Sequence, residues 1–324
     1  MFHPSSADLA YDFRSGMHVV ITGSGSALID PERGGASAAV IVDGAILQFD
    51  CGRGVMENLT RAGINPVDID HLFFTHLHFD HIASFGYFVI STWIAGRQQV
   101  LPVYGPANTR KMAEKLIFGG HFVDVRFASG LVATWPEDVP GRPGDEPPIE
   151  VREIGPGVVM QTDEVMVTAV AVPHFQDLGV QSLGYRVDSA HGSVVITGDG
   201  RPSDAMIELA QGADVLVHEC AKPDADMVTG GKLARSKATD TPSGPHTTPT
   251  WLGRVARDAK VKHLVPTHLG PFRSVPAAFA MSRTYYGDTQ PGPDFWANYE
   301  RRIRETYGGR LTLAHDGLVI TVAE

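Results

Sequence analysis

The sequence predicts an α/β protein with a single domain. Short apolar runs rich in β-branched residues alternate with longer stretches whose apolar residues recur at helical spacing, which is the pattern of strands alternating with helices. A chain of 324 residues could form two average domains, but α/β folds with one shared core often reach this length. Its residues are 43% hydrophobic and 20% charged, as is typical of globular enzymes. We therefore expect one domain that covers residues 1–324.

Three local signals define the elements of the first half. Val19-Val20-Ile21-Thr22 is rich in β-branched residues, and Asp43-Gly44 between two similar runs is a dipeptide that favours tight hairpins. Leu72-Phe73-Phe74 is apolar throughout, which is typical of a strand buried on both faces. The predicted elements are strands at 19–22, 39–42, 46–49, 72–74 and 100–104, and helices at 55–62, 85–95 and 109–118.

The second half continues with the same two patterns. The predicted elements are strands at 165–172, 183–187, 193–197, 215–218 and 264–267, and helices at 205–211 and 250–260. A closing hairpin is expected, in which 311–314 pairs with 318–322 around Asp316-Gly317. Two stretches rich in proline, glycine and polar residues, near 130–148 and 222–245, are predicted loop insertions, and a role as lids is one interpretation of them.

Charge and cysteine content narrow the class of protein. The formal charge of −10 gives no global positive field to attract a polyanion, so a small-molecule substrate is favoured and nucleic acid is not an expected partner. Cys51 and Cys220 cannot form a disulfide framework and stand in apolar contexts, which indicates a reducing compartment. The N-terminus lacks the pattern of a signal peptide and no apolar run reaches about 18 residues. We expect a cytoplasmic protein without a membrane span, or a periplasmic or secreted one if a signal peptide has been removed.

The segment 75–82, THLHFDHI, places three imidazoles and a carboxylate directly after the predicted buried strand at 72–74. Imidazole nitrogens and carboxylate oxygens suit Zn²⁺, Fe and Mn²⁺, and a bound divalent ion normally takes three or more protein ligands. Residues at i and i+2 of an extended segment point the same way. His76 and His78 can therefore bind one ion, while Asp80 and His81, in the turn that follows, can reach a second.

Other strand ends supply the missing ligands. His174, Asp199 and His268 each follow an apolar strand at the point where a loop begins. A short repeat supports the same arrangement, because HLxxTH occurs at 71–76 and again at 263–268, each time ending a strand on a histidine. Together these residues can complete two coordination spheres.

The order of these ligands resembles the metallo-β-lactamase fold superfamily, whose pattern is HxHxDH, then a lone His, a lone Asp and a final His. The resemblance runs from Gly23 to Pro271 and implies a four-layer αββα sandwich and a binuclear metal-dependent hydrolase. The common true β-lactamases carry Cys in place of the lone Asp, so antibiotic hydrolysis is not implied. By resemblance, two divalent ions, most plausibly zinc, with manganese or iron as alternatives, would be held by His76, His78 and His174 and by Asp80, His81 and His268, with Asp199 bridging.

A second pair of motifs resembles the ribonuclease Z-like and arylsulfatase-like branch of that superfamily. The segments 215–221, VLVHECA, and 244–248, GPHTT, correspond to its "HEA" and "HST" segments. In that branch the Glu orients the His, which protonates the leaving group; a carboxylate beside an imidazole fixes its tautomer and raises its pKa. Glu219 and His246 are therefore the expected catalytic pair, and Asp80 is counted with them. Asp50 matches a buried aspartate that supports the metal site in family members.

We expect a hydrolase of a small anionic ester, a phosphodiester or a sulfate ester, because two divalent ions outweigh the charges of Asp80, Asp199 and a bridging hydroxide. That hydroxide, available near neutral pH, would attack the ester. The tRNA-binding arm of ribonuclease Z would fall between His174 and Asp199, where too few residues remain for one. Lactone or other carboxylic ester hydrolysis and tRNA 3′ processing are the alternatives. By resemblance, a homodimer is also expected.

Overall fold

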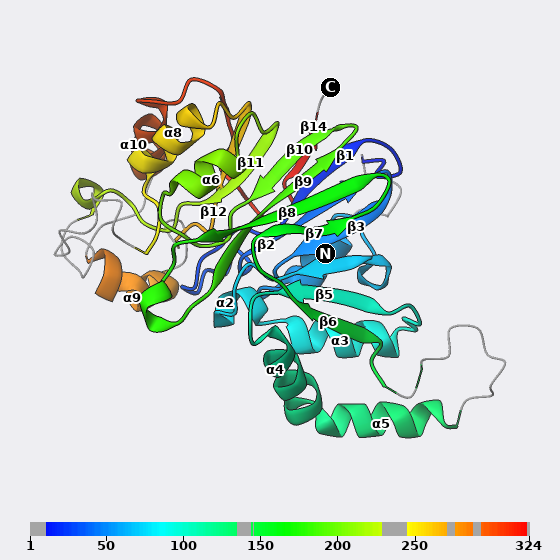
Figure 1. The fold of residues 1–324 in the computed structure, drawn as a ribbon. Helices are drawn as coiled ribbons and strands as arrows, with labels where there is room; N and C mark the ends of the chain where they lie inside the picture. The colour runs from blue at the N-terminus through cyan, green and yellow to red at the C-terminus, as the bar shows by residue number, and fades with distance from the viewer. Residues whose placement is uncertain are drawn as a thin grey trace.

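Two seven-stranded mixed sheets lie at the centre of the computed structural model, which describes residues 11–134, 144, 146–228, 245–270, 276–287 and 293–322 (Figure 1). The first sheet has the order β14 (Val319–Val322), β1 (Met17–Gly23), β2 (Ser37–Val42), β3 (Ala45–Phe49), β4 (His71–Phe73), β5 (Leu101–Gly105) and β6 (Ile149–Glu153). The second sheet has the order β13 (Arg310–Leu311), β12 (His263–Thr267), β11 (Val215–Glu219), β10 (Gly192–Ile196), β9 (Ser182–Ser189), β8 (Val165–Val172) and β7 (Gly157–Gln161).

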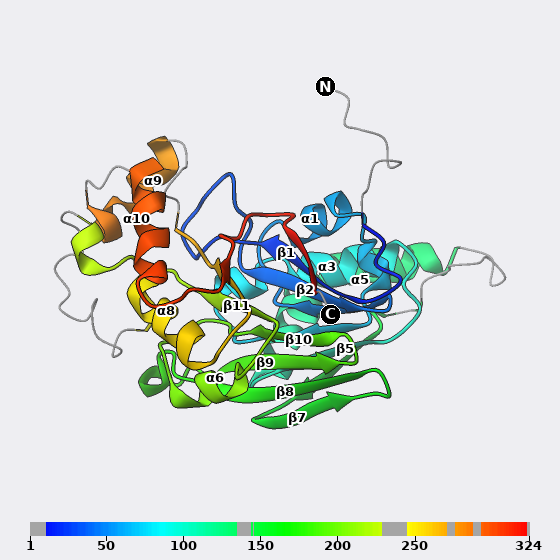
Figure 2. The same ribbon diagram turned by 90° about the horizontal axis from the view of Figure 1, so that it is seen from above.

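Helices cover the outer face of each sheet, which gives the four-layer αββα sandwich that the resemblance implied. Buried side chains of α1 (Val55–Arg61), α3 (Phe85–Ile94) and α5 (Phe122–Val132) pack on the first sheet. Those of α6 (Asp204–Leu209), α8 (Pro249–Asp258) and α10 (Pro293–Arg304) pack on the second sheet. Figure 2 shows α8 and α10 next to each other on the same side of the molecule. The remaining α-helices of the described part are α2 (Phe79–Ile82), α4 (Thr109–Ala113) and α9 (Pro276–Tyr286).

Strand periodicity explains this layering. In β1 the side chains of Val19 and Ile21 face the core between the two sheets, whereas Val20 faces the helices. Successive side chains of a strand point to opposite faces, so a strand between two apolar layers must be apolar at every position. The whole of β1 is buried, and the strand predicted at 19–22 lies within it.

Aromatic packing and two hydrogen bonds join the sheets beneath the site. The Phe73 ring stacks on Phe49 and Tyr104 within the first sheet and packs edge-on against Tyr185 of the second sheet, with centroid distances of 5.0, 4.6 and 5.5 Å. Tyr185 of β9 donates its hydroxyl to the Phe74 carbonyl at 2.7 Å, and the Leu183 amide donates to the Thr75 carbonyl at 2.8 Å. Because these bonds tie the end of β4 to the second sheet, they fix the position of the histidine-rich segment that follows.

The predicted closing hairpin is wrong. Its first part, β13, pairs in parallel with β12 at the edge of the second sheet, whereas β14 pairs antiparallel with β1 in the first sheet. The turn at Asp316-Gly317 therefore carries the chain from one sheet to the other. Asp316 accepts hydrogen bonds from the Ser24 amide and the Gly34 amide, at 2.9 and 2.6 Å, which anchors this crossing in the protein.

The two predicted loop insertions are described only in part. Residues 130–132 belong to the end of α5 and not to a loop, which corrects the start of the first insertion. Most of 133–148 and of 222–245 lies outside the described residues. The strands and helices otherwise predicted are confirmed, with ends shifted by a few residues; the predicted helix at 109–118 is a short α-helix, α4, that continues as a π-helical segment over Glu114–Gly120. No helix of the described part has the length and apolar character needed to cross a bilayer.

Candidate metal centre

The seven predicted ligands meet at one edge of the two sheets, where strands end. His76 follows β4, His174 follows β8, Asp199 follows β10 and His268 follows β12. Since β9 is antiparallel to both β8 and β10, and β10 to β12 are mutually parallel, these strands of the second sheet run the same way. Carboxyl ends of parallel strands share one edge of a sheet, and open α/β sheets place their sites there.

Three imidazoles form the first ligand group. His76 Nε2 lies 2.9 Å from His78 Nδ1, and His174 Nε2 lies 3.2 Å from the same His78 atom. All three rings therefore direct one nitrogen toward a common point. Burial lowers the pKa of His76, His78 and His174, with His81 adding to the effect at His76, so these rings are neutral at pH 7. Neutral imidazole is the form that binds metal ions.

Two imidazoles and a carboxylate form the second ligand group. His268 Nε2 lies 3.1 Å from Asp80 Oδ2 and 3.3 Å from His81 Nε2. Although burial opposes the charged form, Asp199 and Asp50 raise the pKa of His81 well above its usual range. The acids around His81 therefore favour a positive charge at this end of the site.

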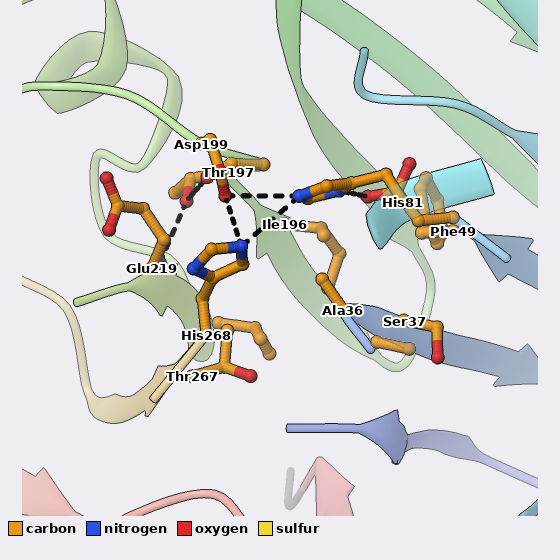
Figure 3. Close-up of a pocket in the computed structure, with 14 residues that line it drawn as sticks. Ala36, Ser37, Phe49, His81, Ile196, Thr197, Asp199, Glu219, Thr267 and His268 are labelled. Carbon is orange, nitrogen blue, oxygen red and sulfur yellow. Dashed lines mark hydrogen bonds and ion pairs between the residues drawn. The ribbon is translucent and has the colours of Figure 1, made fainter. Parts of the chain in front are cut away.

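Asp199 lies between the two ligand groups. Its Oδ1 is 3.3 Å from both His81 Nε2 and His268 Nε2, and its Oδ2 is 3.9 Å from both His76 Nε2 and His174 Nε2. Figure 3 shows Asp199, His81 and His268 pointing toward one another. The residue is 3% exposed, and within the described residues its Oδ1 accepts no hydrogen bond of good geometry. One carboxylate with an oxygen toward each group is suited to bridge two cations.

The donor set fits a pair of divalent metal ions. In each group the potential ligand atoms lie within 4.8 Å of one another. Imidazole nitrogen with carboxylate oxygen is the ligand chemistry of Zn²⁺, Mn²⁺ and Fe. The potential ligand atoms of a third group, Glu219, His246 and His268, also lie within 4.8 Å of one another. Its Glu219 carboxylate is already occupied by protein donors, so we assign it no ion.

Outer hydrogen bonds hold the ligand rings in place. Asp50 Oδ2 accepts from His81 Nδ1 at 2.8 Å, and the same carboxylate accepts from the amide and the hydroxyl of Thr75, both at 2.8 Å. The other ring nitrogen of His174 faces the Pro245 carbonyl at 2.9 Å. Such partners fix the tautomer and orientation of a ligating imidazole. The sequence predicted a supporting role for Asp50 but did not indicate Thr75, because a threonine gives no sequence signal of this kind.

Replacing Asp50 by asparagine is expected to weaken metal binding roughly 10- to 100-fold. The variant keeps the side-chain volume but loses the charge that holds His81. Metal affinity measured by competition with a chelating indicator checks this expectation, and Asp70→Asn is the matched control, because Asp70 accepts an amide hydrogen bond from Ile46 at the other end of β4. Equal affinities in the two variants would contradict a supporting role for Asp50.

Glu219 and His246 adjoin the ligand groups as an ion pair. Glu219 Oε1 lies 3.2 Å from His246 Nδ1 and accepts from the Thr247 and Gly200 amides at 3.0 and 3.1 Å. Burial opposes protonation of His246, but the charge and hydrogen bond of Glu219, with the charge of Asp199, raise the pKa of His246 to about 9. The imidazole is therefore protonated at neutral pH. Its side chain is 23% exposed, whereas that of Glu219 is 1% exposed.

Asp224 holds the segment that carries His246, and sequence reasoning missed it. The Asp224 carboxylate is buried and accepts from the amide and the hydroxyl of Thr250, at 3.3 and 2.8 Å. Burial raises the pKa of Asp224 although hydrogen bonds from Thr248 and Thr250 act the other way. An aspartate in a polar stretch is normally a solvent-exposed residue, so only the folded chain reveals this contact.

Fold and site together define an α/β metal-dependent hydrolase. The family model described as "Beta-lactamase superfamily domain" matches residues 46–269, and the chain belongs to this superfamily as a ribonuclease Z-like member. It is 31% identical over 259 residues to "Ribonuclease Z" of Mycobacterium bovis (strain BCG / Pasteur 1173P2), a match that covers 79% of this chain and 86% of the relative.

Solved structures show the same fold. The metallo-β-lactamase fold protein YhfI from Bacillus subtilis superposes with a TM-score of 0.66 at 19% identity, over 94% of this chain and 98% of that one. The short form of human tRNase Z superposes with a TM-score of 0.63 at 21% identity, over 95% of this chain and 100% of the human chain. At these identities the likeness extends to the fold alone.

Proposed function

We propose that the protein hydrolyses phosphodiester bonds with two divalent cations, zinc being the first candidate, held by the seven converging side chains. The observation that carries the proposal is Asp199, whose two oxygens face the two ligand groups. In hydrolases of this kind, paired divalent ions lower the pKa of bound water and stabilise charge on the reacting ester. Protonation of the leaving group is then the task of side chains of this protein.

The ion pair of Glu219 and His246 supports a role in protonating the leaving group. Glu219 contacts His246 Nδ1, and no hydrogen bond to Nε2 is found among the described residues, so Nε2 can donate a proton to a departing oxygen. The negative charge of Glu219 favours the protonated imidazole, which can donate this proton to an alkoxide as it develops. Alkyl phosphodiesters have such poor leaving groups, so an acid at this position would assist their hydrolysis.

The relatives support phosphodiesters over sulfate esters and lactones. The Mycobacterium relative is named a ribonuclease, and RNA is a phosphodiester. That name runs against the expectation that nucleic acid is not a partner, so RNA is the second candidate substrate. Against RNA stand the net charge of −10 and the residues between His174 and Asp199, which form a 3₁₀ turn (Gln176–Leu178), β9 and β10 and no protruding arm.

A substrate panel tests the proposal. Purified protein is loaded with Zn²⁺, Mn²⁺ or Fe²⁺, and its metal content is measured. It is then assayed with bis(p-nitrophenyl) phosphate, a 2′,3′-cyclic nucleotide, p-nitrophenyl sulfate, a lactone and a 3′-extended tRNA precursor. The expected result is that kcat/KM for the phosphodiesters exceeds that for the sulfate and the lactone by at least about tenfold, and cleavage of the tRNA precursor would select RNA as the substrate. Preferred hydrolysis of the lactone or the sulfate would refute the phosphodiesterase assignment.

A further inference from the structure

Phe175 has a backbone conformation that a bulky residue rarely adopts. Its φ is 45° and its ψ is 31°, in the left-handed region. The other non-glycine residues of the described part with positive φ are Asp43, Asp50, Asn108, Lys260 and His268, all of them polar. Asp and Asn tolerate this region through local hydrogen bonds, but phenylalanine gains nothing comparable. Strain of this kind persists where the surrounding structure enforces it, commonly at functional sites.

The Phe175 ring stands beside the site and is partly exposed. Its centroid lies 4.7 Å from that of His174, 6.1 Å from that of His78 and 6.5 Å from that of His246, each with T-shaped geometry. The ring thus touches two predicted metal ligands and the predicted acid. Yet 41% of the residue is exposed, so the ring does not serve to fill the core.

Exposed apolar side chains continue from Phe175 and from the first ligand group. Leu178 lies three residues further along the chain and is 79% exposed, and Phe79, which directly follows His78, is 69% exposed. Exposed aromatic and aliphatic groups next to a polar, charged site are the arrangement of a binding site that takes a ligand with both an anionic and an apolar part. The metal ligands and the ion pair of Glu219 and His246 account for an anionic part of the ligand but not for an apolar part.

We propose that Phe175 is a specificity-determining residue whose exposed face stacks on a planar aromatic ring attached to the scissile ester. This inference rests on the proposed phosphodiesterase function and names its substrate class: phosphate esters that bear an aryl group or a nucleobase. Aromatic rings stack on one another with a preference beyond simple burial, and base stacking on a side-chain ring tolerates any base. The left-handed backbone is then the cost of presenting the ring to the substrate.

Binding of phosphate monoesters tests the inference without requiring turnover. Titration calorimetry on metal-loaded protein uses phenyl phosphate, thymidine 5′-monophosphate and methyl phosphate, which differ in the ring. Phe175→Leu is expected to weaken binding of the ring-bearing monoesters about tenfold and to leave methyl phosphate unchanged, whereas Phe175→Tyr should bind all three as the unmodified protein does. If Phe175→Leu weakens binding of phenyl phosphate more than that of thymidine 5′-monophosphate, the preferred ring is an aryl group; the opposite order indicates a nucleobase.

Equal weakening of all three ligands, or none, would overturn the inference. Wild-type protein that binds rings through Phe175 but hydrolyses no phosphodiester would refute the proposed function instead, so the two failures are distinguishable. Metal content is measured in every variant, because the Phe175 ring contacts His174 and His78 and a loss of metal must be distinguished from a loss of stacking.

Stability provides an independent readout. Phe175→Gly is expected to melt about 1–2 °C above Phe175→Ala, since glycine adopts positive φ at no steric cost. If both variants instead melt far below the unmodified protein, the ring is a packing residue and the inference fails.

Discussion

Asp199→Ala is expected to remove bound metal and to lower kcat/KM roughly a thousandfold, which corresponds to about 4 kcal/mol of transition-state stabilisation. The reason is geometric, because Asp199 is the side chain with one oxygen toward each ligand group. Without it, five imidazoles and Asp80 face one another with a single carboxylate to offset two divalent charges. Every step that depends on a fixed pair of ions then fails.

Elemental analysis and steady-state kinetics on the same preparation check this prediction. Asp163→Ala serves as the control, since Asp163 is exposed in the turn between β7 and β8. A variant that keeps two metal equivalents and near-normal turnover would show that Asp199 bridges nothing. Loss of one equivalent with partial activity would contradict the expectation that activity requires a fixed pair of ions.

His246→Ala is expected to depress kcat about 10²- to 10⁴-fold for substrates with poor leaving groups and only weakly for p-nitrophenyl esters. A departing alkoxide needs a proton, whereas p-nitrophenolate is stable without one. Glu219→Gln should show the same selectivity to a smaller degree, because the glutamine can still contact His246 Nδ1 but no longer holds its charge. The measurement is kcat over a series of phosphodiesters of increasing leaving-group pKa.

A second histidine–carboxylate pair provides the control. His191 Nε2 lies 2.8 Å from Asp43 Oδ2 in a partly exposed pair that includes none of the predicted site residues. His191→Ala should leave the dependence of kcat on leaving-group pKa unchanged. If His246→Ala instead slows all esters equally, or loses metal, His246 positions the site and does not act as the acid.

Sequence reasoning succeeded where the information is local. The alternation of apolar residues predicted most strands, because burial on one or both faces is encoded in consecutive positions. The Asp43-Gly44 hairpin is confirmed, since its two strands are neighbours in sequence. The repeated HLxxTH segments begin with β4 and β12, which belong to different sheets, and their last histidines, His76 and His268, both face Asp199.

Prediction failed where the partner lies far away in the chain. The segments 311–314 and 318–322 had the pattern of a hairpin. In the structure they do not pair with each other, because β13 pairs with β12 and β14 pairs with β1. A strand pattern specifies a side-chain alternation but not the neighbour that completes its hydrogen bonds. The same limit explains why Asp224 was missed, because its partners lie about 25 residues further on.

By itself the sequence determined the class of protein, because residue types that bind metal and the apolar runs before them are readable position by position. The resemblance implied that Asp199 bridges and that Glu219 pairs with His246, but only the tertiary structure provided the distances of these contacts and the left-handed conformation of Phe175 beside them. The physical reason is that distances, desolvation and backbone strain belong to the packed chain, in which residues far apart in sequence exclude water from one another.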